Sequence, residues 1–312
     1  RDGCHEGQVN ARAILVAALL AICATAASAL EAARPFSVDW QAPEALKAPF
    51  EAHLKSPPPE ARHDRLLLRR WIREARRRAP EIAAAEGWFN AKVEIDDDVE
   101  PLRVTLDPGE RTVVSSVAIT FRGDLAGEGA FRESRRAALE AAWALPEGRP
   151  FRSADWEEAK ARLLEALTAD DYATGSIATS QARVDAAQAK AALSVVLDSG
   201  PAFSLGEVEI AGLERYPARV VQRLVDLDPG EPYRSERLLD LQRLLQNTPY
   251  FAGVSIEIER DPLKPRRVPV RVTLVERPVA DVGLSAGYGT DSGPRGEVSL
   301  RYRNAFGRGY DM

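Results

Sequence analysis

The sequence predicts an α+β protein of three small modules in tandem, each in the order strand, helix, helix, strand, strand, followed by a β-hairpin. One segment occurs twice, as Leu-Pro-Glu-Gly-Arg-Pro-Phe-Arg-Ser at 145–153 and Leu-Asp-Pro-Gly-Glu-Pro-Tyr-Arg-Ser at 227–235. Apolar residues at helical spacing follow both copies. Near the C-terminus, apolar residues alternate with small or polar ones over 282–289 and 297–303, which indicates two strands joined by a turn.

The repeats divide the chain into modules at residues 35–110, 111–200 and 201–278, and the hairpin occupies 279–312. The first module is the most divergent, and its longer helix is predicted by apolar residues at helical spacing between Leu68 and Ile82. The joints between modules are short and rich in Pro and Gly, which is typical of semi-rigid tandem domains. Modules this small have little core of their own, so we expect neighbours to pack on one another.

Residues 1–29 are expected to be a cleaved secretory signal peptide. Arg12 precedes an apolar run over 13–24, and Ala-Ser-Ala at 27–29 has the small-x-small pattern of a cleavage site. Residues 1–11 precede this pattern, and we interpret them as an artefact of an early start or a partial gene. Cys4 and Cys23 are the two cysteines of the sequence, so the mature chain has no thiol for a disulfide or a thiolate metal site.

The terminal hairpin has two interpretations. Two strands of about ten residues with one apolar and one small or polar face are the unit of an outer-membrane β-barrel, but a half-buried hairpin of a soluble sheet has the same pattern. No run of 18 apolar residues follows residue 31, so a barrel is the expected way for the mature chain to enter a membrane. Two strands cannot close a barrel, and we therefore expect a fragment, or the product of a truncated gene, that behaves as a periplasmic arm.

Several motifs carry a family resemblance, chiefly in the third module and the hairpin. They are Asp-Ser-Gly-Pro-x-Phe-x-Leu-Gly-Glu-Val at 198–208, Gly-Leu-Glu-Arg-Tyr at 212–216, Thr-Pro-Tyr-Phe at 248–251, Val-Pro-Val at 268–270, Glu-Arg-Pro at 276–278, Gly-Tyr-Gly-Thr-Asp-x-Gly-Pro-Arg at 287–295 and Asn-x-Phe-Gly-x-Gly at 304–309. The modules resemble POTRA (polypeptide-transport-associated) domains. Three of them before the start of a barrel resemble the Omp85 superfamily, and within it the TamA group.

This resemblance implies an assembly factor in the Gram-negative outer membrane, with its modules in the periplasm, that inserts β-barrel proteins such as autotransporters. The implied partners are unfolded outer-membrane protein clients, an inner-membrane-anchored TamB-like protein docked through the first module, and outer-membrane lipid around the complete protein. Two alternatives stay open. One is a two-partner secretion transporter, for which two modules are expected, and the other is a periplasmic scaffold that never enters a membrane.

The sequence does not indicate an enzyme. It contains no Gly-x-Ser-x-Gly, no Walker-type Gly-x-x-x-x-Gly-Lys and no His-Glu-x-x-His motif. His53 and His63 are interpreted as solvated, and the acidic run over 94–100 lacks the ligand spacing of an EF-hand loop. The net charge of -5 argues against a general nucleic-acid binder. We therefore expect no catalytic residue, no metal site, no cofactor and no nucleic-acid partner.

Function is expected to lie in open sheet edges, where an extended chain can add a strand through its backbone. The penultimate strand of each module is the candidate edge, although each of these strands has an equally simple structural explanation. The candidate partner-binding residues are Val93, Ile95, Ile177, Ala178, Val254 and Ile256.

Two further surfaces are candidates. The first barrel strand is rich in Gly, which weakens strand pairing and suits a lateral gate, while small residues facing a lumen explain it equally well. Its candidate gate residues are Val282, Gly283, Leu284, Gly287 and Tyr288. The long helix of the first module carries a basic face that either is simply solvated or contacts anionic lipid headgroups or an acidic partner. That face comprises Arg69, Arg70, Arg73, Arg76 and Arg77.

Overall fold

The computed structural model describes residues 37–62, 64–98, 101–289 and 293–302. The expected signal peptide, His63 and the motif at 304–309 lie outside the described residues. The chain divides into two compact units. The first runs to Ser116 and includes Pro146–Trp156 and Arg183–Ala192, and the second takes the remaining residues. The division therefore passes through the predicted second module, because three segments of that module, residues 111–116, 146–156 and 183–192, group with the first one.

The first sheet has three strands, and its last strand lies in the middle. β1 (Val38–Gln41) runs parallel to β3 (Leu102–Asp107), and β2 (Lys92–Asp96) pairs antiparallel with β3 on its other side. Burial alternates along β3, with Leu102, Val104 and Leu106 facing the core. They pack under α2 (Glu44–His53) and α3 (Arg65–Ala85), which a short 3-10 turn, η1 (Pro59–Arg62), separates.

The long helix α3 begins where the sequence provides a cap. The carboxylate of Asp64 accepts hydrogen bonds from the backbone N–H groups of Leu66 and Leu67. Ile72, Ala75 and Ala79, together with Ala83 in the last turn, are buried against the sheet, as the helical spacing predicted. The capping residue thus fixes where the helix starts, and the spacing of the apolar residues fixes which face of the helix is buried.

The second sheet repeats the same order, with β6 (Lys190–Asp198) between β4 (Val113–Arg122) and β5 (Ser176–Asp185). Its helices are α4 (Ala130–Ala141), which η2 (Gly123–Ala126) precedes, and α5 (Ser153–Ala169). The third sheet again places its last strand, β9 (Val268–Glu276), between β7 (Leu205–Ala211) and β8 (Phe251–Ile258). Its first helix, α6 (Arg219–Gln222), has only four residues, whereas α7 (Ser235–Gln246) has 12 residues and buries Leu238, Leu241 and Leu245.

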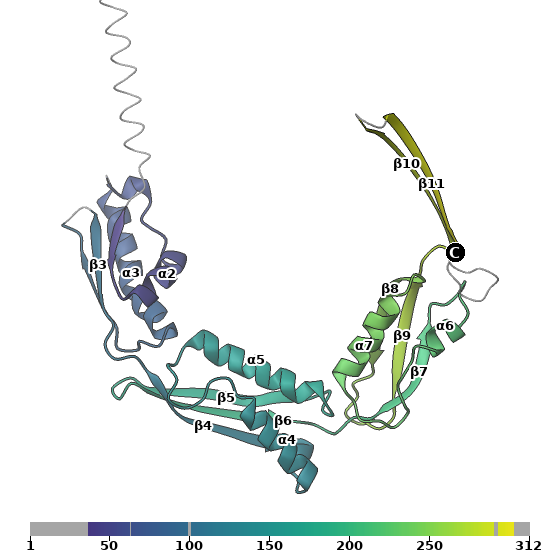
Figure 1. Cartoon of the computed structure of the whole chain (residues 1–312). Coiled ribbons are helices and arrows are strands. Elements are labelled where there is room, and N and C mark those ends of the chain that lie inside the picture. The colour runs from purple at the N-terminus through teal and green to yellow at the C-terminus, as the bar shows by residue number, and fades with distance from the viewer. Residues whose placement is uncertain (1–36, 63, 99–100, 290–292, 303–312) are drawn as a thin grey trace, which may run out of the picture. The chain divides into compact units, whose positions relative to one another are not determined.

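The α+β order is therefore confirmed, and Figure 1 shows helices lying beside each three-stranded sheet. After the third sheet, β10 (Ala280–Gly289) and β11 (Gly293–Tyr302) form an antiparallel pair in which Val282 lies opposite Leu300 and Leu284 opposite Val298. These four side chains are exposed. No helix within the described ranges is long and apolar enough to cross a membrane.

Candidate binding edges of the three sheets

The penultimate strands β2, β5 and β8 each lie at the edge of a sheet, because β3, β6 and β9 occupy the middles. Two of the predicted residues, Ile95 and Val254, turn their side chains into the core under the helices. Val93, Ile177 and Ile256 are half-buried and Ala178 is exposed. What these strands offer to another chain is therefore mainly their backbone rather than a row of apolar side chains.

The opposite edges are formed by the first strands β1, β4 and β7, which the sequence analysis missed. No local pattern in the sequence could have found them, because they follow from the last strand of each module lying between the other two. In the second module, the repeated segment protects the start of this edge: Val114 N donates to Arg149 O at 2.9 Å, and Gly148 N donates to Val114 O at 2.8 Å.

The third module repeats this protection with the second copy of the segment. Leu205 N donates to Glu231 O at 2.8 Å, and Gly230 N donates to Leu205 O at 2.7 Å. In the part of the chain that the structure describes, no backbone hydrogen bond from outside its own sheet reaches β2, β5 or β8. The starts of β4 and β7 are thus capped by backbone bonds, whereas only side chains reach β8 from outside its ladder, with Arg277 Nε donating to Phe251 O and Gln246 Nε2 to Val254 O.

The same repeated segment also joins the first and second modules. Thr112 N donates to Gly87 O at 2.8 Å, and Phe151 N donates to Thr112 O at 2.9 Å. Gly87 lies just after α3 with a φ of +100°, and a Cβ there would sit 2.1 Å from the carbonyl oxygen of Phe151. Only glycine can occupy this position without moving the joint. Arg111 stacks over Trp88 with its guanidinium carbon 4.5 Å from the ring centroid.

The joint after the second module has the same pattern. Phe203 N donates to Asp171 O at 2.7 Å, and Tyr233 N donates to Phe203 O at 3.0 Å. Asp171 stands where Gly87 stands in the first joint, just after a helix and with a φ of 62°. Burial raises the pKa of the Asp171 carboxyl. The repeated segment, which the sequence analysis used only to find the modules, is therefore the element that connects them.

A polar cluster supports the second module beside this joint. The carboxylate of Asp124 accepts hydrogen bonds from Arg132, at 2.7 and 3.1 Å, and from the hydroxyl of Tyr172 at 3.0 Å. The hydrogen bond from Arg132 lowers the pKa of Asp124, and Tyr172 adds to this effect while burial opposes it. Burial, followed by the hydrogen bond to Asp124, raises the pKa of Tyr172. The three groups satisfy one another and leave no free acid or base.

The predicted basic face lies on the solvent side of α3, with Arg69, Arg70, Arg73, Arg76 and Arg77 all exposed. Arg77 differs from the others because its guanidinium contacts Glu74 at 2.7 Å and Glu81 at 3.3 Å. The hydrogen bond to Glu74 raises the pKa of Arg77. Arg65, one turn before Arg69, is also exposed and extends the face toward the start of the helix.

The candidate gate strand β10 places its apolar residues on one side. Val282, Leu284 and Tyr288 are exposed, and Gly283 and Gly287 lie opposite Ser299 and Arg295 of β11. A Cβ on Gly287 would meet no atom within 4 Å, and one on Gly283 would meet the Ser299 hydroxyl, which can rotate away. Neither glycine is required by the hairpin itself.

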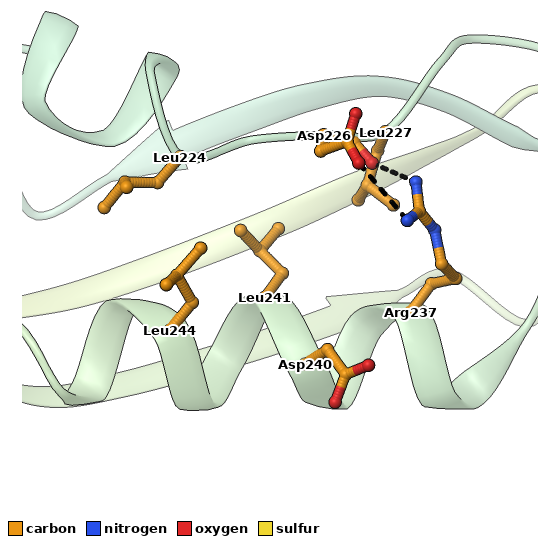
Figure 2. Close-up of a pocket in the computed structure, with 7 residues that line it drawn as sticks. All are labelled: Leu224, Asp226, Leu227, Arg237, Asp240, Leu241 and Leu244. Atoms are coloured by element: carbon orange, nitrogen blue, oxygen red, sulfur yellow. Dashed lines mark hydrogen bonds and ion pairs between the residues drawn. The ribbon is translucent and has the colours of Figure 1, made fainter.

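A groove of about 260 Å³ lies in the third module between α7 and the segment before it. Figure 2 shows Leu224 and Leu227 facing Leu241 and Leu244 of α7, with Arg237 reaching Asp226 at one end. The sequence analysis did not find this groove, since it depends on how α7 folds back against the segment that precedes it. Among the described residues, no group of three His, Cys, Asp or Glu side chains is arranged to hold a metal ion.

Residues 203–277, which contain the third sheet and its joint, match the POTRA family model, described as surface antigen variable number repeat. The chain is 29% identical over 105 residues to the outer membrane protein assembly factor BamA of Neorickettsia risticii (strain Illinois). This alignment covers 34% of the chain and 14% of that relative. The chain thus spans about a seventh of the relative's length.

One of the solved structures similar to this chain shares its fold. BamA from Haemophilus ducreyi lacking POTRA domains 1–3 covers 64% of this chain, with 36% of its own length, a TM-score of 0.50 and 14% identity. POTRA domains 3–5 of Haemophilus influenzae BamA cover 78% of this chain, with 96% of their own length, a TM-score of 0.44 and 17% identity. The chain is thus similar to POTRA domains and to a BamA protein, and neither match singles out the TamA group.

Proposed function

We propose that this chain belongs to an outer-membrane protein assembly factor and that it captures client or partner chains as added strands on β5 and β8. The observation that carries the proposal is the asymmetry of the edges. The repeated segment caps the starts of β4 and β7, while β5 and β8 receive no backbone hydrogen bond from outside their sheets in the described structure. An extended client can satisfy these open N–H and C=O groups.

The relatives named as BamA support assembly of outer-membrane proteins as the process in which this happens. Unfolded outer-membrane proteins suit the open edges, because their alternating strands can extend a sheet without a dedicated pocket. Within this function we favour a TamA-like role, with autotransporter barrels as clients and an inner-membrane-anchored TamB-like partner on the first module. The basis is the sequence motifs of the third module and hairpin.

Proline substitution on β8 tests strand addition. Along an edge strand successive amides point alternately inward and outward, so one of the two variants Ser255→Pro and Ile256→Pro removes an outward donor and keeps the ladder with β9. We expect that variant to fold and to lose binding of an unfolded autotransporter β-domain diluted from urea, measured by fluorescence anisotropy. Ser255→Thr, which retains the amide, is the control.

The same pair of prolines on β5, at Ala178 and Thr179, separates the two edges. Loss of binding on one strand alone would assign the client to that edge. Unchanged client binding in every correctly folded proline variant would contradict strand addition as the mode of capture. Circular dichroism identifies the variants that keep the fold.

A further inference from the structure

The solvent face of α3 carries a dense row of arginines that nothing in the proposed edge binding uses. Arg65, Arg69, Arg73 and Arg76 follow one another three or four residues apart, so their side chains share one side of the helix. The helix has 21 residues and is therefore about 31 Å long. The opposite side is buried against the sheet, which leaves the arginines pointing into solvent.

These charges have no ion-pair partner among the residues that the structure describes. Arg65, Arg69, Arg70, Arg73 and Arg76 form no ion pair with any carboxylate that the structure describes, in contrast to Arg77 and Arg78, which contact Glu74. Arginines three or four residues apart repel one another, and the carboxylate at the start of α3, that of Asp64, already accepts hydrogen bonds from the backbone N–H groups of Leu66 and Leu67. The row therefore weakens the isolated helix and gains from an external anion.

An exposed leucine lies within this basic face. Leu66 is 76% exposed and sits one position after Arg65 and three before Arg69. A basic helix face with a protruding apolar side chain fits a lipid surface, where arginines meet phosphates and the leucine enters the boundary of the acyl chains. Mobile headgroups can match a row of charges at any spacing, and the face offers a row rather than a pocket.

Glu74 and Glu81 lie on α3 and pair with Arg77 and Arg78, whereas two other acidic side chains of the first module lie away from the arginine row. Glu94 and Asp96 alternate along β2 with Ile95, which is buried under the helices, so the two carboxylates point to the other side of the sheet. The arginine row is therefore a local concentration of positive charge on a chain whose net charge is -5. An anionic surface would orient the module with α3 toward it.

We propose that the basic face of α3, formed by Arg65, Arg69, Arg70, Arg73 and Arg76 around Leu66, binds the surface of an anionic phospholipid membrane. The test uses the full chain with vesicles of phosphatidylcholine alone and of phosphatidylcholine mixed in equal parts with phosphatidylglycerol. We expect binding to the anionic vesicles only, measured by flotation, and release of the bound protein by high salt. Salt release separates this binding from apolar insertion of the β10–β11 hairpin, which salt does not weaken.

The variants R69Q, R73Q and R76Q in one chain should reduce binding by roughly fivefold for each charge and about a hundredfold together. The matched control R122Q, R183Q and R223Q removes the same charge from exposed arginines on other elements and should bind as the wild-type chain does. Leu66→Gln should weaken binding without changing the charge, and circular dichroism checks that each variant is folded.

Three results would overturn the proposal. They are no binding to anionic vesicles, equal binding to neutral ones, and equal losses in the α3 variant and the control. Binding to poly-glutamate but not to vesicles would also overturn it and assign the face to an acidic protein. None of these results depends on client capture by β5 and β8, so the two proposals can fail separately.

Discussion

The Nε atom of Arg152 lies 2.7 Å from Oε2 of Glu86, and this ion pair links the repeated segment of the second module to the end of α3 in the first. The hydrogen bond to Glu86 raises the pKa of Arg152 above its ordinary value. The ion pair lies beside the backbone hydrogen bond from Thr112 N to Gly87 O. It also lies beside the contact between the Phe89 and Phe151 rings, whose centroids are 5.9 Å apart. A charged pair, a backbone bond and an aromatic contact thus meet at one joint.

The pair should contribute modestly to the joint. Both side chains are partly exposed, so we expect a coupling free energy of about 1 kcal/mol from a double-mutant cycle of Glu86→Gln and Arg152→Gln. Denaturant unfolding followed by tryptophan fluorescence measures it. The exposed pair Arg162–Glu158 on α5 serves as the comparison and should show a smaller coupling. Equal couplings at the two sites would mean that the joint does not depend on this contact.

Gly87→Ala should destabilise the joint by more than the strain of placing alanine at a positive φ. A Cβ at Gly87 meets the Phe151 carbonyl at 2.1 Å, while Gly148 has a similar φ of +82° with nothing within 4 Å. We expect Gly148→Ala to cost about 1 kcal/mol of unfolding free energy and Gly87→Ala distinctly more. Hydrogen exchange of the Thr112 amide, which donates to Gly87, gives a local measurement. Equal protection in both variants would exclude the close contact as the cause.

Glu276 should hold the loop before α6 against the end of β9. Its carboxylate accepts hydrogen bonds from three successive backbone N–H groups, those of Glu214, Arg215 and Tyr216, at 2.9 to 3.0 Å. We expect Glu276→Ala to expose these amides to hydrogen exchange and to cost about 2 kcal/mol. Glu276→Gln keeps one acceptor oxygen and should lose less protection. If the alanine variant leaves exchange at 214–216 unchanged, the loop has another support.

Asp124 should make the stability of the second module fall in acid. Its folded pKa lies below the unfolded value of 3.8, chiefly because of the hydrogen bond from Arg132, so its stabilisation is complete above that value and is lost as the pH falls through the folded pKa. Asp124→Asn should be less stable than the wild-type chain near neutral pH, and the difference should shrink below pH 3.8. Urea unfolding at both pH values measures this. A difference that does not depend on pH would contradict the ionic role.

The gate hypothesis predicts a functional loss without a folding defect. Gly287→Val on β10 fits sterically, because a Cβ there meets no atom within 4 Å, and Gly283→Val requires only a rotation of Ser299. In the complete protein, stronger pairing of this strand should slow client insertion into vesicles. Gly296→Val on β11 also meets no neighbouring atom and is the matched control. Insertion at the wild-type rate in the double β10 variant would count against gating.

Local patterns in the sequence predicted much of this architecture. Apolar residues at helical spacing between Leu68 and Ile82 predicted the long helix of the first module, and the structure confirms it with Ile72, Ala75 and Ala79 on the buried side of α3. The exposure of the arginines followed from the same helical period. These features depend on residues a few positions apart, and side-chain direction within a strand or helix repeats at that range.

Only the tertiary structure decided which strands lie at the edges and what covers them. Strand order depends on hydrogen bonds between segments far apart in the chain, such as the pairing of Val38 with Leu102, and no local period encodes them. The second edges at β1, β4 and β7, the capping of β4 by the repeated segment and the two matching joints appeared for this reason. The sequence determined which side of each element is apolar, and the fold determined which backbone groups remain open, because one is a local and the other a non-local property of the chain.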